Sequence, residues 1–452
     1  MVRISSLALA CALAAPAAGQ LVFQSSFEAG EGGMQLPPNP EDVAPDRDTG
    51  YPTAPCDAFG FLYNGSMPVQ FGVDESQIDC DALGILGGRV VDRDMNPIQG
   101  VNVAIKDRPE FGFTLTRADG EYDLAVNGGG RLTLVFGGDD MLSATREAEL
   151  PPRVDLTLDD VMLIGLDANV TTIMADMSDP QMITGSAVTD VDGTRTARLM
   201  VPANTSMMMD DGAGGMTPMS QLAVRITEYT VGPNGPMAMP ADLPPTSEYT
   251  YAVEFSADEG VEQPVRFSQP LASYNENFLE FPTGTVIPHG YFDRELGQWV
   301  PAENGLVVEI LSEAAGTVTL AVDSTGAAAT QNQLDSLGIS ADELTMLAET
   351  YAPGASLWRV PVRNFSPHDY NYALPDNAVP PPPPAPQPTD VQVDRSDPRF
   401  GRIEYQRQVF QETMDIAGVP FSLHYSSDRT PGRLAERRAF IPITQAVSPE
   451  GL

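Results

Sequence analysis

The chain has 452 residues, enough for about two to four domains with hydrophobic cores of their own. It carries 62 acidic residues against 25 basic ones, a formal net charge of −37, and Lys106 is its single lysine. A nucleic-acid-binding face needs a basic patch that neutralises phosphates, and an anionic membrane surface repels acidic proteins, so the charge argues against both kinds of partner. Such an acidic excess is typical of a solubility charge on an exported protein.

Residues 1–19 have the features of a secretory signal peptide. Arg3 supplies a positive start, Leu7 to Ala15 form a short apolar run, and Ala17-Ala-Gly19 provides small residues before the cleavage point. Cys11 leaves a lipoprotein site open as an alternative. The run is too short to span a bilayer, and nothing else reaches about 18 apolar residues, so we expect no membrane span and a secreted or cell-surface protein.

Residues 20–83 form an acidic arm that we expect to be largely disordered. Its first part is rich in Gly, Pro, Asp and Glu and lacks apolar periodicity. In Phe59 to Phe71, Asn64-Gly65 separates two apolar runs, which predicts a docking hairpin. Cys56 and Cys80 are an even pair in an exported chain, which favours a disulfide over two free thiols.

Residues 84–160 read as a small antiparallel sandwich that begins with two β-hairpins. The alternation of Val101, Val103 and Ile105 is that of a half-buried strand, and Asp119-Gly120 is a strong turn signal. The remaining predicted strands are Val90–Val91, Tyr122–Val126, Arg131–Phe136 and Arg153–Leu158.

Residues 161–372 predict a second, larger β-domain with short strands and a helical insert. Ser340 and Glu343 form a capping box that starts one helix, and a second helix is expected around Thr330–Leu337. Met207-Met-Met209, close to Gly212–Gly215, predicts a flexible loop. The strand candidates are Ala197–Val201, Leu222–Thr230, Tyr249–Phe255, Val265–Phe267, Val286–His289, Gly290–Phe292, Leu306–Leu311 and Thr317–Val322. Trp299 and Trp358 are predicted core anchors.

Residues 373–400 contain Pro380 to Pro384 and predict a polyproline spacer. Eight arginines lie between Arg395 and Arg438, most of them in residues 401–452. Two further strands are expected there, Glu404–Asp415 and Phe421–Tyr425.

The sequence contains no recognisable catalytic set, so we expect no enzyme, no cofactor and no metal. His289, His368 and His424 are far apart in sequence and lie in turn-like or strand-like contexts, without the close spacing of a zinc site. No nucleophile elbow, phosphate loop or dinucleotide fingerprint occurs. Two acidic turns, Asp92 to Asn96 and Asp190 to Asp192, resemble the start of a calcium loop but lack its later ligands. Weak calcium binding there stays an alternative.

Several stretches together resemble the pre-repeat region of bacterial Rhs/YD-repeat proteins and teneurins, including a carboxypeptidase-regulatory-like (transthyretin-like) domain. They are Gly100–Val103, Pro109–Gly120, Tyr122–Gly130, Gly185–Thr194, Glu228–Pro236, Gly290–Arg294, Gln298–Pro301, Ser356–Pro361 and Ala417–Tyr425. The resemblance implies a scaffold that supports or plugs a β-shell around a C-terminal effector. It also implies that residues 401–452 begin that shell, while the tyrosine-aspartate repeats themselves are absent from this sequence.

We therefore expect an all-β protein: a transthyretin-like β-sandwich over 84–160, a larger β-sandwich over 161–372, a Pro-rich linker and the start of a β-shell. The leading hypothesis is a non-enzymatic scaffold whose partner is the downstream YD-repeat shell. The alternative is a stand-alone secreted β-sandwich module for adhesion or for binding carbohydrate or cell-surface proteins, with calcium dependence as an option.

Overall fold

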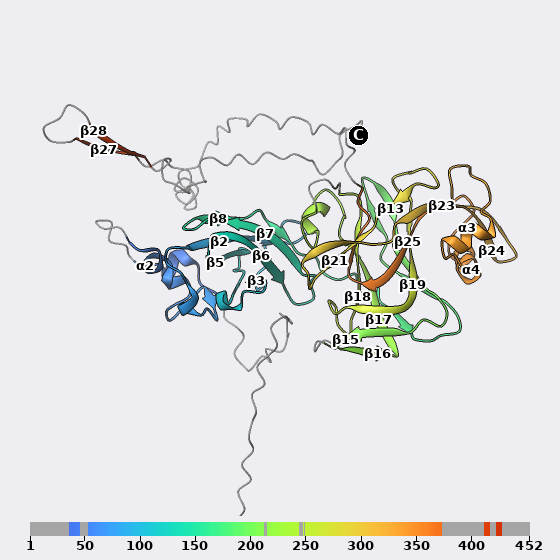
Figure 1. The fold of residues 1–452 in the computed structure, drawn as a ribbon, viewed down its shortest axis with the longest axis horizontal. Helices are drawn as coiled ribbons and strands as arrows, with labels where there is room; N and C mark the ends of the chain where they lie inside the picture. The colour runs from blue at the N-terminus through green and yellow to red at the C-terminus, as the bar shows by residue number, and fades with distance from the viewer. Residues whose placement is uncertain are drawn as a thin grey trace, which may run out of the picture.

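The computed structural model describes residues 36–45, 53–211, 215–243, 247 and 249–372, together with the backbone of 411–415 and 422–426. The predicted signal peptide, Pro-rich linker and most of residues 401–452 lie outside the described residues. Within them, the all-β prediction is confirmed: strands in several sheets dominate and the helices are short. Two β-bodies lie side by side (Figure 1), the first made of β1 to β9 and the second of β10 to β26.

The first body is a sandwich of two sheets, with strand orders β1-β4-β3-β6-β7 and β5-β2-β8, and β9 pairs with β2. Its strands are β1 (Gln70–Phe71), β2 (Leu83–Val91), β3 (Asn102–Ile105), β4 (Phe113–Leu115), β5 (Glu121–Asn127), β6 (Gly130–Gly137), β7 (Ala144–Leu150), β8 (Asp155–Thr157) and β9 (Val161–Met162). Alternate residues such as Val103, Leu124 and Leu134 point inward and are fully buried in one core. The period-2 pattern therefore located the core of this body.

The two predicted hairpins are wrong, although their strands exist. β2 and β3 lie in opposite sheets, and so do β4 and β5. The turn at Asp119-Gly120 forms, with Gly120 at φ 78°, but it carries the chain across the sandwich. The residues of a turn determine where the chain reverses. The sheet that the next strand joins depends instead on the apolar face that this strand must bury.

The arm is ordered in the residues that the structure describes, 36–45 with the short helix α1 (Pro40–Val43) and 53–83, so the prediction of a largely disordered arm is wrong there. A short helix, α2 (Pro55–Phe59), and a 3₁₀ turn (Gly60–Leu62) replace the expected first strand of the hairpin, and only β1 pairs, with β4. Leu62 and Val69 pack against the outer face of β2 and β5. A disulfide joins Cys56 to Cys80, with 5.1 Å between their Cα atoms. These contacts bury apolar side chains and so stabilise the arm, which its polar composition had not led us to expect.

The second body is a larger sandwich with a six-stranded sheet and a nine-stranded sheet. The first has the order β10 (Thr171–Met174), β17 (Gln221–Glu228), β18 (Ala252–Ala257), β26 (Pro367–Asp369), β21 (Gly290–Asp293) and β22 (Gln298–Pro301). The second has the order β11 (Gln181–Thr184), β14 (Arg198–Val201), β19 (Val265–Glu276), β25 (Ser356–Phe365), β23 (Gly305–Ala314) and β20 (Val286–Ile287), with β15 (Met207–Asp210), β16 (Met216–Met219) and β24 (Thr317–Ala321) attached. A separate ribbon pairs β12 (Val188–Asp190) with β13 (Gly193–Arg195).

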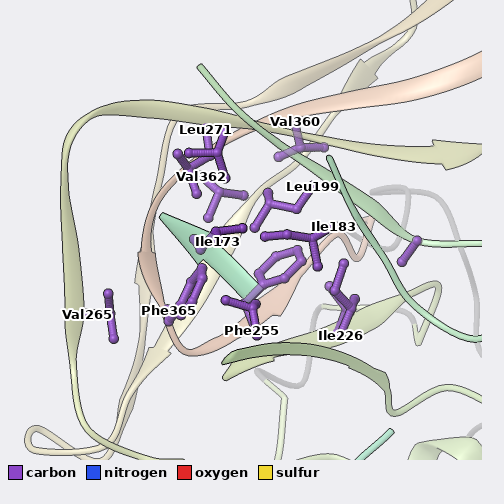
Figure 2. Close-up of a cluster of buried hydrophobic side chains, with 14 of the residues drawn as sticks. Ile173, Ile183, Leu199, Ile226, Phe255, Val265, Leu271, Val360, Val362 and Phe365 are labelled. Carbon is purple, nitrogen blue, oxygen red and sulfur yellow. The ribbon is translucent and has the colours of Figure 1, made fainter. Parts of the chain in front are cut away.

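The core between these sheets is built from aliphatic and aromatic side chains of both layers. Figure 2 shows Ile173, Ile226 and Phe255 of one sheet meeting residues of the other, such as Leu199 and Val360. On the outer face of the nine-stranded sheet, α3 (Gln331–Ser336) and α4 (Ala341–Thr350) cover a second cluster.

Both predicted helices form, but the capping box belongs to the other one. In α3, Thr330 and Gln333 make the reciprocal cap. In α4, Ser340 accepts from the Glu343 amide, while the Glu343 side chain points inward and accepts from Arg359 and Tyr274. For the Glu343 side chain, the ion pair with buried Arg359 is more stabilising than a capping hydrogen bond from the exposed backbone amide of Ser340.

The methionine segment is a strand and the predicted flexible loop is wrong at this point. Met207–Asp210 forms β15, which pairs with β16 and β19, and Met207 is buried in the core. At the other end of the chain, Gln411–Asp415 (β27) and Ser422–Ser426 (β28) form a two-stranded antiparallel sheet.

Trp358 is fully buried, and its ring contacts Tyr251, Phe278 and Phe281 while its Nε1 donates to Asn277 at 2.8 Å. We therefore expect Trp358→Ala to lower the free energy of unfolding by about 3–5 kcal/mol, measured by chemical denaturation. Trp299→Ala is the control, because Trp299 is only partly buried and should cost less. A loss below about 1 kcal/mol at Trp358 would contradict this packing.

Candidate functional site

The region most distinctive for function is the joint between the two bodies. A separate apolar cluster crosses it, with Val91, Leu142, Met162 and Ile164 from the first body and Tyr229, Ala238, Met239 and Ala252 from the second. An apolar contact of this kind restricts the domain motion that two linked sandwiches would otherwise show.

Arg146 is the central polar group of the joint. It lies on β7 in phase with the buried residues Ala144 and Ala148, so its side chain leaves the strand on the core side of the first sandwich, and its guanidinium reaches the second body. The guanidinium donates to the carbonyl oxygens of Met237 at 2.8 Å and Met239 at 3.0 Å. Because carbonyl oxygens at fixed positions accept from a planar, permanently charged donor, this contact sets orientation as well as adding stability.

Further bonds tie the same two surfaces together. Arg93 donates to the carbonyl oxygens of Glu228 and Tyr229, at 2.5 and 3.1 Å. Lys106 donates to the carbonyl oxygen of Arg294 at 3.2 Å. Arg93 lies in the turn after β2 and Lys106 at the end of β3. Together with Arg146 on β7, three separate parts of the first body therefore contact the second.

A buried ion network lies directly behind the joint. Arg294 Nη2 is 2.8 Å from Glu254 Oε2, and the Tyr229 hydroxyl donates to the same carboxylate at 2.7 Å. Burial outweighs the attraction of Arg294 and raises the pKa of Glu254 above its ordinary value. Tyr229 also belongs to the apolar cluster of the joint, so the network and the interface share a residue.

The two acidic turns have other partners than calcium. Asp190 accepts from both terminal nitrogens of Arg195, and these bonds lower the pKa of Asp190 to about 2. Asp92 accepts from the Asp94 and Asn96 amides within its own turn. Across the described ranges, no group of three or more His, Cys, Asp or Glu side chains is placed to hold a metal ion.

The structure brings together two histidines that are far apart in sequence. His289, between β20 and β21, lies with its Nε2 2.9 Å from Nδ1 of His368 on β26, and both rings are buried. Burial lowers the pKa of His289 to about 4 and that of His368 well below its ordinary value. A turn role was expected for His289; the pairing was missed.

A partly open pocket of about 260 Å³ lies beside this pair. Its lining is His289, Tyr291, Val300, Pro301, Ala302, Glu303, Pro361, Arg363 and Asn364. The charged members, Glu303 and Arg363, pair with each other at 3.1 Å on the exposed rim. His424 lies in β28, whose side chains are outside the described residues.

Comparison with known proteins points to one family for the first body. Residues 78–163 match the teneurin TTR-like domain. This teneurin-like segment contains β2 to β9 of the first body, without β1, and ends just after β9, beside the joint. Mouse teneurin-3 is 35% identical over 107 residues, covering 24% of this chain and 4% of that protein. Teneurin-1 of Caenorhabditis elegans is 32% identical over 119 residues, covering 23% and 4%.

These relatives are far longer proteins, and the similarity reaches only about a twenty-fifth of their length. A solved streptococcal ancillary pilin covers 49% of this chain and 59% of its own, with 13% identity and a TM-score of 0.18, which identifies no shared fold. In the part of the chain that the structure describes, every helix is too short or too polar to cross a membrane.

The joint yields a direct mutational test. Arg146→Met leaves the Met237 and Met239 carbonyl oxygens without their donor, so we expect a loss of about 2–4 kcal/mol in the free energy of unfolding. Hydrogen exchange should show the added opening on both sides of the joint, at β7 and at Gly235–Ala238. The control is Arg131→Met, whose pair with Glu147 is exposed and worth under about 1 kcal/mol. Equal losses in the two variants would refute a special role for Arg146.

Asp369, on β26, provides a pH test. Burial raises the pKa of its carboxyl to about 7, against about 3.9 in an unfolded chain. Between these values the folded state holds a proton that the unfolded state lacks, so this group's contribution to stability declines as pH rises toward 7 and stays low above it.

Asp369→Asn keeps an acceptor for the Asn371 amide, which donates to Asp369 at 2.7 Å, and removes the titration. We expect the stability gain of this variant over the parent protein, measured by denaturation, to be larger at pH 8 than at pH 5. A gain that is independent of pH would contradict the buried, proton-holding carboxyl.

Proposed function

We propose that this chain is a non-enzymatic structural region of an exported Rhs/YD-repeat, teneurin-like protein. In this proposal, the two sandwiches form one rigid support for a β-shell that encloses an effector. The observation that carries the proposal is the teneurin TTR-like match over residues 78–163, fastened to a second sandwich by buried arginine-to-carbonyl bonds. Support of a large shell needs a base whose parts keep a fixed orientation, and the joint supplies that property.

The distribution of polar groups is consistent with a structural role. The joint cations Arg93 and Arg146 are bound to backbone oxygens. The buried carboxylates Glu228, Glu254 and Glu343 are each bound by an arginine. Catalytic side chains usually keep an atom accessible to substrate. These arginines and glutamates are instead bound to other groups of the protein.

Export to the cell surface or medium is part of the same proposal. The disulfide between Cys56 and Cys80 is of the kind that persists in oxidising compartments. The downstream shell is the proposed partner, and the region does not itself bind nucleic acid or span a membrane.

The direct test is the natural transcript beyond the codon for Leu452. The proposal predicts in-frame tyrosine-aspartate repeats there. A stop codon followed by an unrelated gene would contradict the shell and favour a stand-alone secreted module.

If repeats follow, the full natural product with Arg146→Met should lose protease protection of its C-terminal part, because a loosened base no longer holds the shell. The matched Arg131→Met protein should keep that protection. Equal protection in both would argue against the supporting role.

A further inference from the structure

The four ring nitrogens of His289 and His368 lie in a row of three short contacts. His289 Nδ1 is 2.9 Å from the carbonyl oxygen of Glu303, and His289 Nε2 is 2.9 Å from His368 Nδ1. His368 Nε2 is 3.0 Å from the carbonyl oxygen of Asn364. The ring centroids are 5.1 Å apart, and both residues are buried.

Counting protons in this row shows that two neutral rings cannot satisfy it. A carbonyl oxygen only accepts, so both outer nitrogens, His289 Nδ1 and His368 Nε2, must carry hydrogen. Each neutral imidazole has one N–H, so two lone pairs would then face each other across the central 2.9 Å contact. The Ser366 hydroxyl is 3.5 Å from His368 Nε2, too far to be a strong alternative donor.

A third proton completes the row. One ring becomes an imidazolium, the other stays neutral, and the central contact becomes an N–H···N hydrogen bond. A fourth proton would place donors on both sides of that contact and two positive charges on adjacent buried rings.

We propose that His289 and His368 form a proton-binding site. The two neutral rings bind one proton and share it as an imidazole–imidazolium pair, and they do not bind a second proton. This inference goes beyond the structural function proposed above and does not depend on it. The site makes the attachment of β26 responsive to pH, because His368 is the middle residue of this three-residue strand, which lies between β18 and β21.

The surrounding charges favour one proton over two. The titratable and charged groups on the neighbouring elements are Glu254 on β18, Tyr291 and Asp293 on β21, Glu303 after β22, Arg359 and Arg363 on β25, Asp369 on β26 and Tyr370 after it. Arg294 already neutralises Glu254, and Arg363 already pairs with Glu303. Asp369 occupies the alternate position on β26, so its side chain leaves the opposite face of the strand from His368.

Burial opposes protonation of either ring and lowers the pKa of both, with His289 acting on His368 as a second cause. Uptake of the single proton is therefore expected on the acid side of neutrality. Unfolded, the two histidines bind two protons below about pH 6, so the folded state holds two fewer until the pair takes up its proton and one fewer after that. This pair's contribution to stability is thus fully present above about pH 6.5 and falls on acidification, by up to about a hundredfold in the unfolding equilibrium constant per pH unit before the uptake and about tenfold after it.

The experiment is NMR titration of the full chain labelled with ¹⁵N-histidine, from about pH 7.5 to about 3.5 so that it passes the lowered pKa of His289, with circular dichroism to establish that the chain stays folded. His424→Gln identifies the third histidine's signals. We expect His289 and His368 to titrate together with one midpoint and one proton in total. At acid pH, a strongly deshielded N–H proton should couple to nitrogens of both rings.

His289→Gln removes the partner ring and should abolish the uptake by His368. If this variant does not fold, the titration of the parent protein decides alone. Two independent titrations of one proton each, or two rings that stay neutral throughout while the protein is folded, would each overturn the proposal.

Discussion

The bond from Arg146 to the backbone oxygens of Met237 and Met239 is the contact on which the arrangement of the two bodies depends. Each sandwich buries its own core, so neither needs the other for its internal packing. Their relative position instead rests on a small apolar cluster, on three cations, Arg93, Lys106 and Arg146, and on hydrogen bonds from Ser143 and Thr145 to the second body. Apolar contact alone is non-directional, whereas charged donors aimed at fixed carbonyl oxygens select one orientation.

The acidic composition explains why these few cations matter. With 25 basic residues against 62 acidic ones, each buried arginine is placed where its loss would leave carboxylates or carbonyls without a partner. Arg195, Arg294 and Arg359 each bind a buried glutamate in the second body. Removing one member of such a pair lowers the free energy of unfolding by more than the intact pair contributes to it, because an uncompensated buried charge remains. In the second body, arginines thus neutralise the buried glutamates.

Sequence patterns predicted the strands better than their connections. Alternation identified several β-strands of each body because burial on one face imposes a period of two. It failed where the decision is non-local: β2 and β3 were assigned to one hairpin but join opposite sheets, and Phe59 to Phe71 begins as helix. β7 was missed because its inward residues, Ala144, Arg146 and Ala148, include two small side chains and a charge.

The candidate sites were harder to predict than the fold. Arg146 falls in the inward phase of β7, and that position is the signal which could have identified it. The contact between His289 and His368 joins residues 79 positions apart through the sheet order, so no local pattern contains it. The Asp190 turn resembles a calcium loop until Arg195, five residues later, occupies it.

A distance measurement between the two bodies tests the central claim most directly. Spin labels at Glu149→Cys on β7 and Glu349→Cys on α4 occupy exposed positions, one in each body, on a Cys11→Ser background in which Cys56 and Cys80 are paired. Pulsed electron paramagnetic resonance on the full chain should give a single narrow distance distribution that Arg146→Met broadens. A broad distribution in the parent protein would show that the sandwiches move independently and would contradict the account.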